Sequence, residues 1–190
     1  VDIGEIGAVT AIHIFFSYMN TDPKNIRNKK VNGGGALMDI GCYAVSSSRF
    51  ILGKEPQRVM SLVTIDPSFK IDSQTSGILD FGDSRCLFTS STQSNPFQRV
   101  EIHGAAGFLS VNIPFNPYTD VPVTIDVVTS IGRRSIPFGP VDQYRNQFDA
   151  CSRAIIEGKE FPYPASDGVA NMRVIDALFK SAESGTWERV

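Results

Sequence analysis

The chain has 190 residues, of which 42% are hydrophobic, and a formal net charge of −2 at pH 7. This length and apolar fraction suffice for one hydrophobic core, so we expect a single domain over residues 1–190. Basic residues run no further than the pairs Lys29-Lys30 and Arg133-Arg134, a pattern that argues against nucleic acid and anionic membranes as partners. Small, near-neutral molecules fit this charge better.

The cysteines indicate where in the cell the protein is located, and the first residues indicate whether the chain is a fragment. Cys42, Cys86 and Cys151 are odd in number, far apart and in no CxxC pair, which favours free thiols in a reducing compartment. We therefore expect a cytoplasmic protein, and no apolar run approaches the roughly 20 residues that span a bilayer. The start, VDIGEIG, has no initiator Met and reads like the tail of an element that begins upstream, as in a fragment.

The first part of the chain predicts a strand, a loop and a helix. Residues 8–18, AVTAIHIFFSY, are rich in β-branched and aromatic side chains, which is typical of a strand. A polar loop then leads to three glycines. Over residues 36–52 apolar side chains recur with a period close to 3.6, which predicts a helix that stops at Gly53.

A long β region follows, and two helices close the chain. Strand-like runs bounded by turn residues cover 57–66, 75–81, 85–92, 98–103, 108–113, 121–129 and 133–137. Short turns join these runs, so we expect an antiparallel meander. Helices are predicted over 143–157 and 167–184, the second with Ser166 as N-cap and Gly185 as stop. The fold class is α+β, a large open sheet with helices on one face. If the other face is apolar, we expect it to pair with another copy.

The candidate chemistry lies in residues 33–43, GGGALMDIGCY. At a spacing of four, Asp39 and Tyr43 share one face of a helix, and a carboxylate in the first turn suits the helix dipole. The N–H groups that follow Gly34 and Gly35 can receive a hydroxyl-rich ligand. A phenol can donate or accept a proton, but with a reference pKa of about 10 it needs a nearby cation. Spacing alone leaves an alternative open, in which Asp39 orients the glycine turn and Tyr43 packs with its hydroxyl bonded.

Other polar residues carry weaker signals. Arg27, in the loop before the glycines, can bind a polyol or form a salt bridge. His13 and His103 stand isolated in strand-like runs without a partner at metal-ligand spacing, so we interpret them as structural and expect no metal site. Asp72 is interpreted as an ordinary turn or strand-end carboxylate. The sequence has no GxSxG elbow and no Cys beside a His, which removes support for acyl transfer.

These motifs together resemble a known family. GGGALMDIGCY, followed by Arg49 and GKEPQRV, is similar to the glycine-rich segment and first helix of the C-terminal domain in Gfo/Idh/MocA oxidoreductases. GEIGAVTAIHIFFSY, ILDFGDSRCLF and IHGAAGFLSV resemble strands of that domain, and SDGVANMRVIDALFKSAESG resembles its closing helix. The resemblance covers nearly the whole chain. It implies the open-sheet fold of the glyceraldehyde-3-phosphate dehydrogenase C-terminal type.

The resemblance also implies an activity. Such proteins act on a sugar, polyol or related hydroxyl compound with NAD or NADP, and they form homodimers or homotetramers through the sheet. By motif position Tyr43 is the proton donor or acceptor and Asp39 the second catalytic residue, with Arg27, Gly34 and Gly35 beside the substrate. A tyrosine here resembles the glucose-fructose oxidoreductase, xylose dehydrogenase and dihydrodiol dehydrogenase branches. A lysine of the family's nucleotide domain is the expected cation.

The chain departs from the family in one respect. No GxGxxG follows a predicted strand, so the Rossmann domain that binds the cofactor is absent and no cofactor-binding residue is expected here. We therefore interpret the chain as the substrate-binding and oligomerisation domain of an NAD(P)-dependent oxidoreductase, inactive by itself. The alternative is a stand-alone, non-catalytic sheet module that serves self-association or polyol binding.

Overall fold

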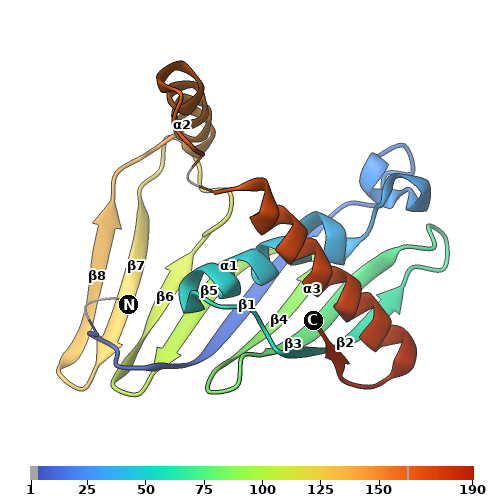
Figure 1. Cartoon of the computed structure of the whole chain (residues 1–190), viewed down its shortest axis with the longest axis horizontal. Coiled ribbons are helices and arrows are strands. Elements are labelled where there is room, and N and C mark those ends of the chain that lie inside the picture. Colours follow the sequence, from blue (N-terminus) through green and yellow to red (C-terminus); the bar gives the residue numbers. More distant parts are fainter. Residues whose placement is uncertain (1–3, 162) are drawn as a thin grey trace.

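The computed structural model describes residues 4–161 and 163–190, which include one nine-stranded sheet. Its strands lie in the order β8-β7-β6-β5-β1-β4-β3-β2-β9 (Figure 1). The strands are β1 (Val9–Met19), β2 (Arg58–Ile65), β3 (Asp72–Asp80), β4 (Arg85–Ser91), β5 (Gln93–Gly104), β6 (Gly107–Asn112), β7 (Val123–Thr129), β8 (Gly132–Phe138) and β9 (Glu188–Arg189). The α-helices are α1 (Cys42–Leu52), α2 (Gln143–Glu157) and α3 (Ala165–Ser184). The expected α+β class with a mainly antiparallel open sheet is confirmed. The first three residues of VDIGEIG lie outside the described residues.

The expected meander is wrong at one point, because β1 lies between β4 and β5. It runs parallel to β4, with Ile14 opposite Phe88, and antiparallel to β5, with Ile14 opposite Val100. The chain passes from β4 to β5 over the end of β1 at Thr92, whose carbonyl accepts from the Asn20 N–H at 2.8 Å. Residues 93–96, expected to lie between two strands, belong to β5. Short turns indicate strand reversal, but they do not reveal a distant strand inserted between neighbours.

One face of the sheet carries the hydrophobic core. In Figure 1, α1 and α3 cross this face, whereas α2 projects beyond the ends of β7 and β8. Alternate strand residues point at the helices, as the period of two requires. The core joins, among others, Ile12, Ile14, Cys86, Phe88, Val100 and Ile102 of the strands to Val45, Val174, Ile175 and Leu178 of the helices. Two of the three α-helices therefore cover the sheet as expected.

The helix predicted over 36–52 starts differently from expectation. Leu37–Gly41 is a π-helix and α1 follows it directly, ending at Gly53 in the left-handed conformation. The carboxylate of Asp72 accepts from the Leu37 N–H at 2.6 Å and from the Thr75 hydroxyl at 2.9 Å. Asp72 is therefore a buried helix-start acceptor rather than an ordinary turn carboxylate. A short π-helix of this kind is a local irregularity that often marks functional sites.

The closing helix also begins earlier than the pattern indicated. Its N-cap is Pro164 rather than Ser166, and its first turn holds Asp167. Proline has a fixed φ and no N–H to satisfy, so it suits a helix start without a side-chain hydrogen bond. The expected stop at Gly185 is confirmed, with φ at 68°.

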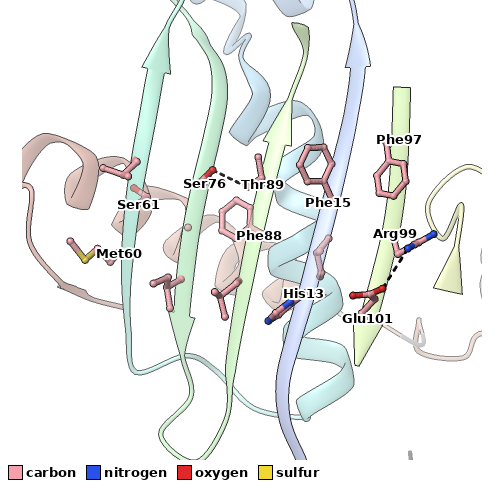
Figure 2. Close-up of a pocket in the computed structure, with 15 residues that line it drawn as sticks. His13, Phe15, Met60, Ser61, Ser76, Phe88, Thr89, Phe97, Arg99 and Glu101 are labelled. Carbon is pink, nitrogen blue, oxygen red and sulfur yellow. Dashed lines mark hydrogen bonds and ion pairs between the residues drawn. The ribbon is translucent and has the colours of Figure 1, made fainter. Parts of the chain in front are cut away.

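The opposite face of the sheet is open and substantially apolar. Side chains of β1 to β5 line a hollow of about 590 Å³ on it, seen face-on in Figure 2. The exposed apolar side chains there include Phe15, Leu62, Leu87 and Phe97.

Candidate active site

A cavity of about 540 Å³ lies where β1 ends, β5 begins and the π-helix starts. Its walls are aromatic and its rim is polar, a combination typical of sites for small hydroxyl compounds. Three of the five predicted site residues, Arg27, Asp39 and Tyr43, line it. The remaining lining residues are Phe16, Ser17, Tyr18, Asn20, Ile40, Pro96, Phe97, Gln98, Ile113, Phe115, Asn116, Tyr118 and Tyr144.

Asp39 is held by donors from two other elements. Arg27, in the 3-10 turn Ile26–Asn28, donates from Nε to Oδ1 at 2.8 Å, and the Tyr18 hydroxyl on β1 donates to Oδ2 at 2.5 Å. Of the two roles considered for Arg27, the salt bridge is present, and the side chain, 48% exposed, still lines the cavity. Sequence reasoning missed Tyr18. Its position at the end of a strand that enters the glycine loop is the one sequence signal that could have found it.

Tyr43 presents its ring to the cavity. It packs edge-on against Phe16, with ring centroids 5.7 Å apart, and tilts against Phe115 at 5.3 Å. Burial raises the pKa of Tyr43, the nearby Cys42, Tyr144 and Asp39 add to the rise, and Arg27 opposes it. The phenol therefore remains protonated at neutral pH, which is the form that can donate a proton.

The two glycines expected beside the substrate have a packing explanation. A Cβ on Gly34 would stand 2.3 Å from the Arg27 carbonyl oxygen, and one on Gly35 would stand 1.8 Å from Oδ1 of Asp72. Gly35 also has φ at +132°, a conformation that favours glycine. Neither glycine is among the residues that line the cavity. A substrate contact from Gly34 or Gly35 stays a prediction.

The structure also places the two histidines, as well as the cysteine that precedes Tyr43. His13 and His103 are not isolated, because β1 and β5 are neighbours and bring the two rings to 5.3 Å between centroids. Cys42, next to Tyr43, has its pKa raised to about 11, mainly by burial. It is therefore a thiol rather than a thiolate at neutral pH.

Dinucleotides bind where a glycine-rich turn joins a strand to a helix. Within the described ranges the glycines are placed otherwise. Gly104 and Gly107 pair across the β5–β6 hairpin, and Gly33 ends a 3-10 turn. These described glycines therefore do not form such a strand-to-helix turn.

The cavity and fold define an α+β domain built on an open sheet. A tyrosine and a carboxylate that accepts two side-chain hydrogen bonds lie at its first helix. A family model described as the GFO/IDH/MocA C-terminal domain matches residues 1–110. The chain belongs to this family, which confirms the resemblance found in the sequence.

Two curated relatives of this chain have names that describe oxidoreductases. An uncharacterized oxidoreductase of Rhizobium meliloti is 37% identical over 98% of this chain and 58% of its own length. A D-xylose 1-dehydrogenase (NADP(+)) of Haloferax volcanii is 32% identical over 95% of this chain and 56% of its own length. The chain thus spans little more than half the length of these curated relatives.

Solved structures share the fold. A 3-ketoreductase from Actinomadura kijaniata, in complex with NADP and TDP-benzene, superposes with a TM-score of 0.88 at 20% identity, over 95% of this chain and 56% of that one. An aldose-aldose oxidoreductase from Caulobacter crescentus, complexed with glycerol, gives 0.85 at 25% identity over 100% and 58%. None of the helices in the described part of this chain has the length and hydropathy needed to cross a membrane.

Proposed function

We propose that this chain is the substrate-binding and oligomerisation domain of an NAD(P)-dependent oxidoreductase that acts on a sugar, polyol or related hydroxyl compound. The observation that carries the proposal is the placement of Tyr43 in an aromatic cavity beside the Arg27–Asp39–Tyr18 network. The names of the relatives, a xylose dehydrogenase and an inositol 2-dehydrogenase among them, support this substrate class.

In this proposal the nicotinamide cofactor, held mainly by a nucleotide domain outside this chain, supplies or accepts hydride. The chain itself binds the substrate in the cavity, against the stacked rings of Phe16 and Phe115, and excludes water from it. Tyr43 gives a proton to the substrate oxygen in the reducing direction and takes it back in the oxidising one. Because burial raises its pKa, the oxidising direction needs a cation besides Arg27 near the phenol. By itself the chain is expected to be inactive, since the cofactor site lies elsewhere.

Asp39 has a positioning role in this scheme. Each of its two carboxylate oxygens accepts a hydrogen bond, one from Arg27 and one from Tyr18. The carboxylate thereby fixes both side chains at the cavity wall. Arg27 then keeps its positive charge close to the phenol. This arrangement orients the substrate hydroxyls and limits the rise in the pKa of Tyr43.

The open sheet face is the proposed surface for a homodimer or homotetramer. Leu62 is 75% exposed there, and apolar side chains of β1, β4 and β5 extend the patch around it. Contiguous exposed apolar surface of this kind usually marks an interaction site. The three cysteines are free in the structure, which supports a reducing compartment and a cytoplasmic location.

The test uses full-length protein, with D-xylose and myo-inositol as probes and NADP⁺ and NAD⁺ as cofactors. Tyr43→Phe is expected to lower kcat by about 100-fold or more, with cofactor affinity unchanged. Tyr163→Phe removes an exposed hydroxyl outside the cavity and is the matched control. Unchanged turnover in Tyr43→Phe would remove Tyr43 from the mechanism. No turnover by the wild-type protein across aldoses and polyols would favour the alternative, a non-catalytic module.

A further inference from the structure

Three metal-ligating side chains meet on the open face of the sheet, away from the cavity of Tyr43. His13 lies on β1 directly opposite Glu101 on β5, and His103 follows Glu101 by two residues on the same face. Figure 2 shows His13 and Glu101 on these neighbouring strands. The fold thus brings together residues separated by about ninety positions, which is why their spacing in the sequence gave no metal-ligand pattern.

The distances suit a shared ion. One ligand atom from each of His13, Glu101 and His103 can be chosen so that all three lie within 4.8 Å of one another. Nε2 of His103 stands 3.8 Å from Oε2 of Glu101. Zinc bonds of about 2.0–2.2 Å place tetrahedral ligands roughly 3.4 Å apart, so the side chains need to close by only about 1 Å. His13 is exposed and Glu101 half-buried, which leaves them free to make this adjustment.

A second observation concerns His103 alone. Its Nε2 atom is buried and, within the described part of the chain, has no hydrogen-bond partner. Leaving a buried polar atom unpaired is costly, and such atoms in folded proteins are usually satisfied by a group, a water or an ion. The ring of His103 stacks on Phe108 at 5.3 Å between centroids, which fixes its plane, and Nε2 lies on the side of Glu101.

We propose that His13, Glu101 and His103 bind a divalent transition-metal ion of the zinc type. Two imidazoles and one carboxylate are ligands that zinc accepts, and they leave a fourth position open for water or another ligand. The ion ties β1 to β5 across the middle of the sheet. None of the three ligands lines the cavity of Tyr43, so the site does not depend on the proposed oxidoreductase function.

One neighbour works against the ion. Arg99 lies on β5 with Nη1 at 3.6 Å from Oε1 of Glu101. Its positive charge competes with a metal for the carboxylate. The structure therefore predicts opposite effects for two kinds of substitution, namely weaker binding when a ligand is removed and tighter binding when Arg99 is neutralised.

The experiment uses full-length, tag-free protein that has been stripped with a chelator. Co²⁺ is titrated while its visible d–d absorption is recorded, and Zn²⁺ is then added to displace it. The wild type is expected to bind about one ion per chain. His13→Ala, His103→Ala and Glu101→Gln are each expected to weaken binding by about tenfold or more, and Arg99→Gln to strengthen it.

Gln74→Ala is the matched control, since this exposed polar side chain lies on the same face, on β3, and is expected to leave the titration unchanged. Circular dichroism confirms that each variant is folded. Absence of a saturable Co²⁺ absorption in the wild type would overturn the proposal. So would a titration that His103→Ala and Glu101→Gln leave as it is.

Discussion

The hydroxyl of Tyr18 lies 2.5 Å from Oδ2 of Asp39 and donates to it, which joins the end of β1 to the π-helix that precedes α1. The two residues are 21 positions apart and come from different elements. Burial, followed by the hydrogen bond to Asp39, raises the pKa of Tyr18, so this phenol stays protonated and acts as a donor. The pair fixes one wall of the cavity in which Tyr43 stands.

Replacing Tyr18 by phenylalanine removes one of the two donors to the Asp39 carboxylate. A hydrogen bond to a charged group contributes roughly 1.5–3 kcal/mol. Because Asp39 is partly exposed and water can replace the donor, we expect the free energy of unfolding to fall by about 1.5 kcal/mol. Urea denaturation of the full-length protein measures this, with the exposed Tyr163→Phe as control. A loss no larger than the control's would show that the contact does not stabilise the fold.

Stability should also depend on alkaline pH through the same tyrosines. Burial raises the pKa of Tyr18 and of Tyr43 above the reference value of 10.0. Unfolded tyrosines ionise near pH 10 while these two remain protonated in the folded chain, so unfolding releases protons and stability falls as pH rises above about 10. The double variant Tyr18→Phe/Tyr43→Phe should lose less stability than wild type between about pH 9 and about pH 11. Parallel pH profiles would contradict this.

Local patterns predicted most of the elements. Alternation and turn residues placed the strands from β2 to β8 within a few residues, except that β5 begins at Gln93 rather than at residue 98, and the pattern gave α2 over residues 143–157. Gly53 and Gly185 ended their helices as expected, because a left-handed C-terminal residue is a local requirement. These features depend on residues a few positions apart, which sequence reasoning can compare.

What the sequence did not reveal depends on distant contacts. The insertion of β1 between β4 and β5 decides which side chains meet, and no local pattern specifies it. That insertion brings His13 to Glu101. The paired donors of Asp39 likewise come from β1 and from a 3-10 turn. The cavity's catalytic candidates were predicted from a motif, whereas their partners required the fold.

Gly35 can be tested against a neighbouring glycine. Alanine at Gly35 would combine a φ of +132° with a Cβ 1.8 Å from Oδ1 of Asp72, which would also disturb the helix-start hydrogen bond to Leu37. We expect Gly35→Ala to cost about 3 kcal/mol or more. Gly33→Ala has φ at +70° but open space around its Cβ, and should cost about 1–2 kcal/mol. Equal losses in thermal or urea unfolding would show that the contact with Asp72 relaxes freely.

The proposed self-association through the open face makes a final prediction. Leu62 lies on β2, lines the hollow of the open face and is 75% exposed, so lysine there is accepted by the monomer. In an interface the same lysine would bury a charge without a partner, which is strongly unfavourable. We therefore expect Leu62→Lys to convert a dimer or tetramer of the full-length protein into smaller species in light scattering at about micromolar concentration.

Val31→Lys is the control for this change, because Val31 is an apolar side chain, 91% exposed, in the loop before the glycines rather than on the sheet. It should leave the mass of the oligomer unchanged. If Leu62→Lys also leaves the mass unchanged, subunits do not associate through this face. If the wild-type protein is already a monomer at that concentration, the open face has another role, and the metal site formed by His13, Glu101 and His103 becomes the first place to examine.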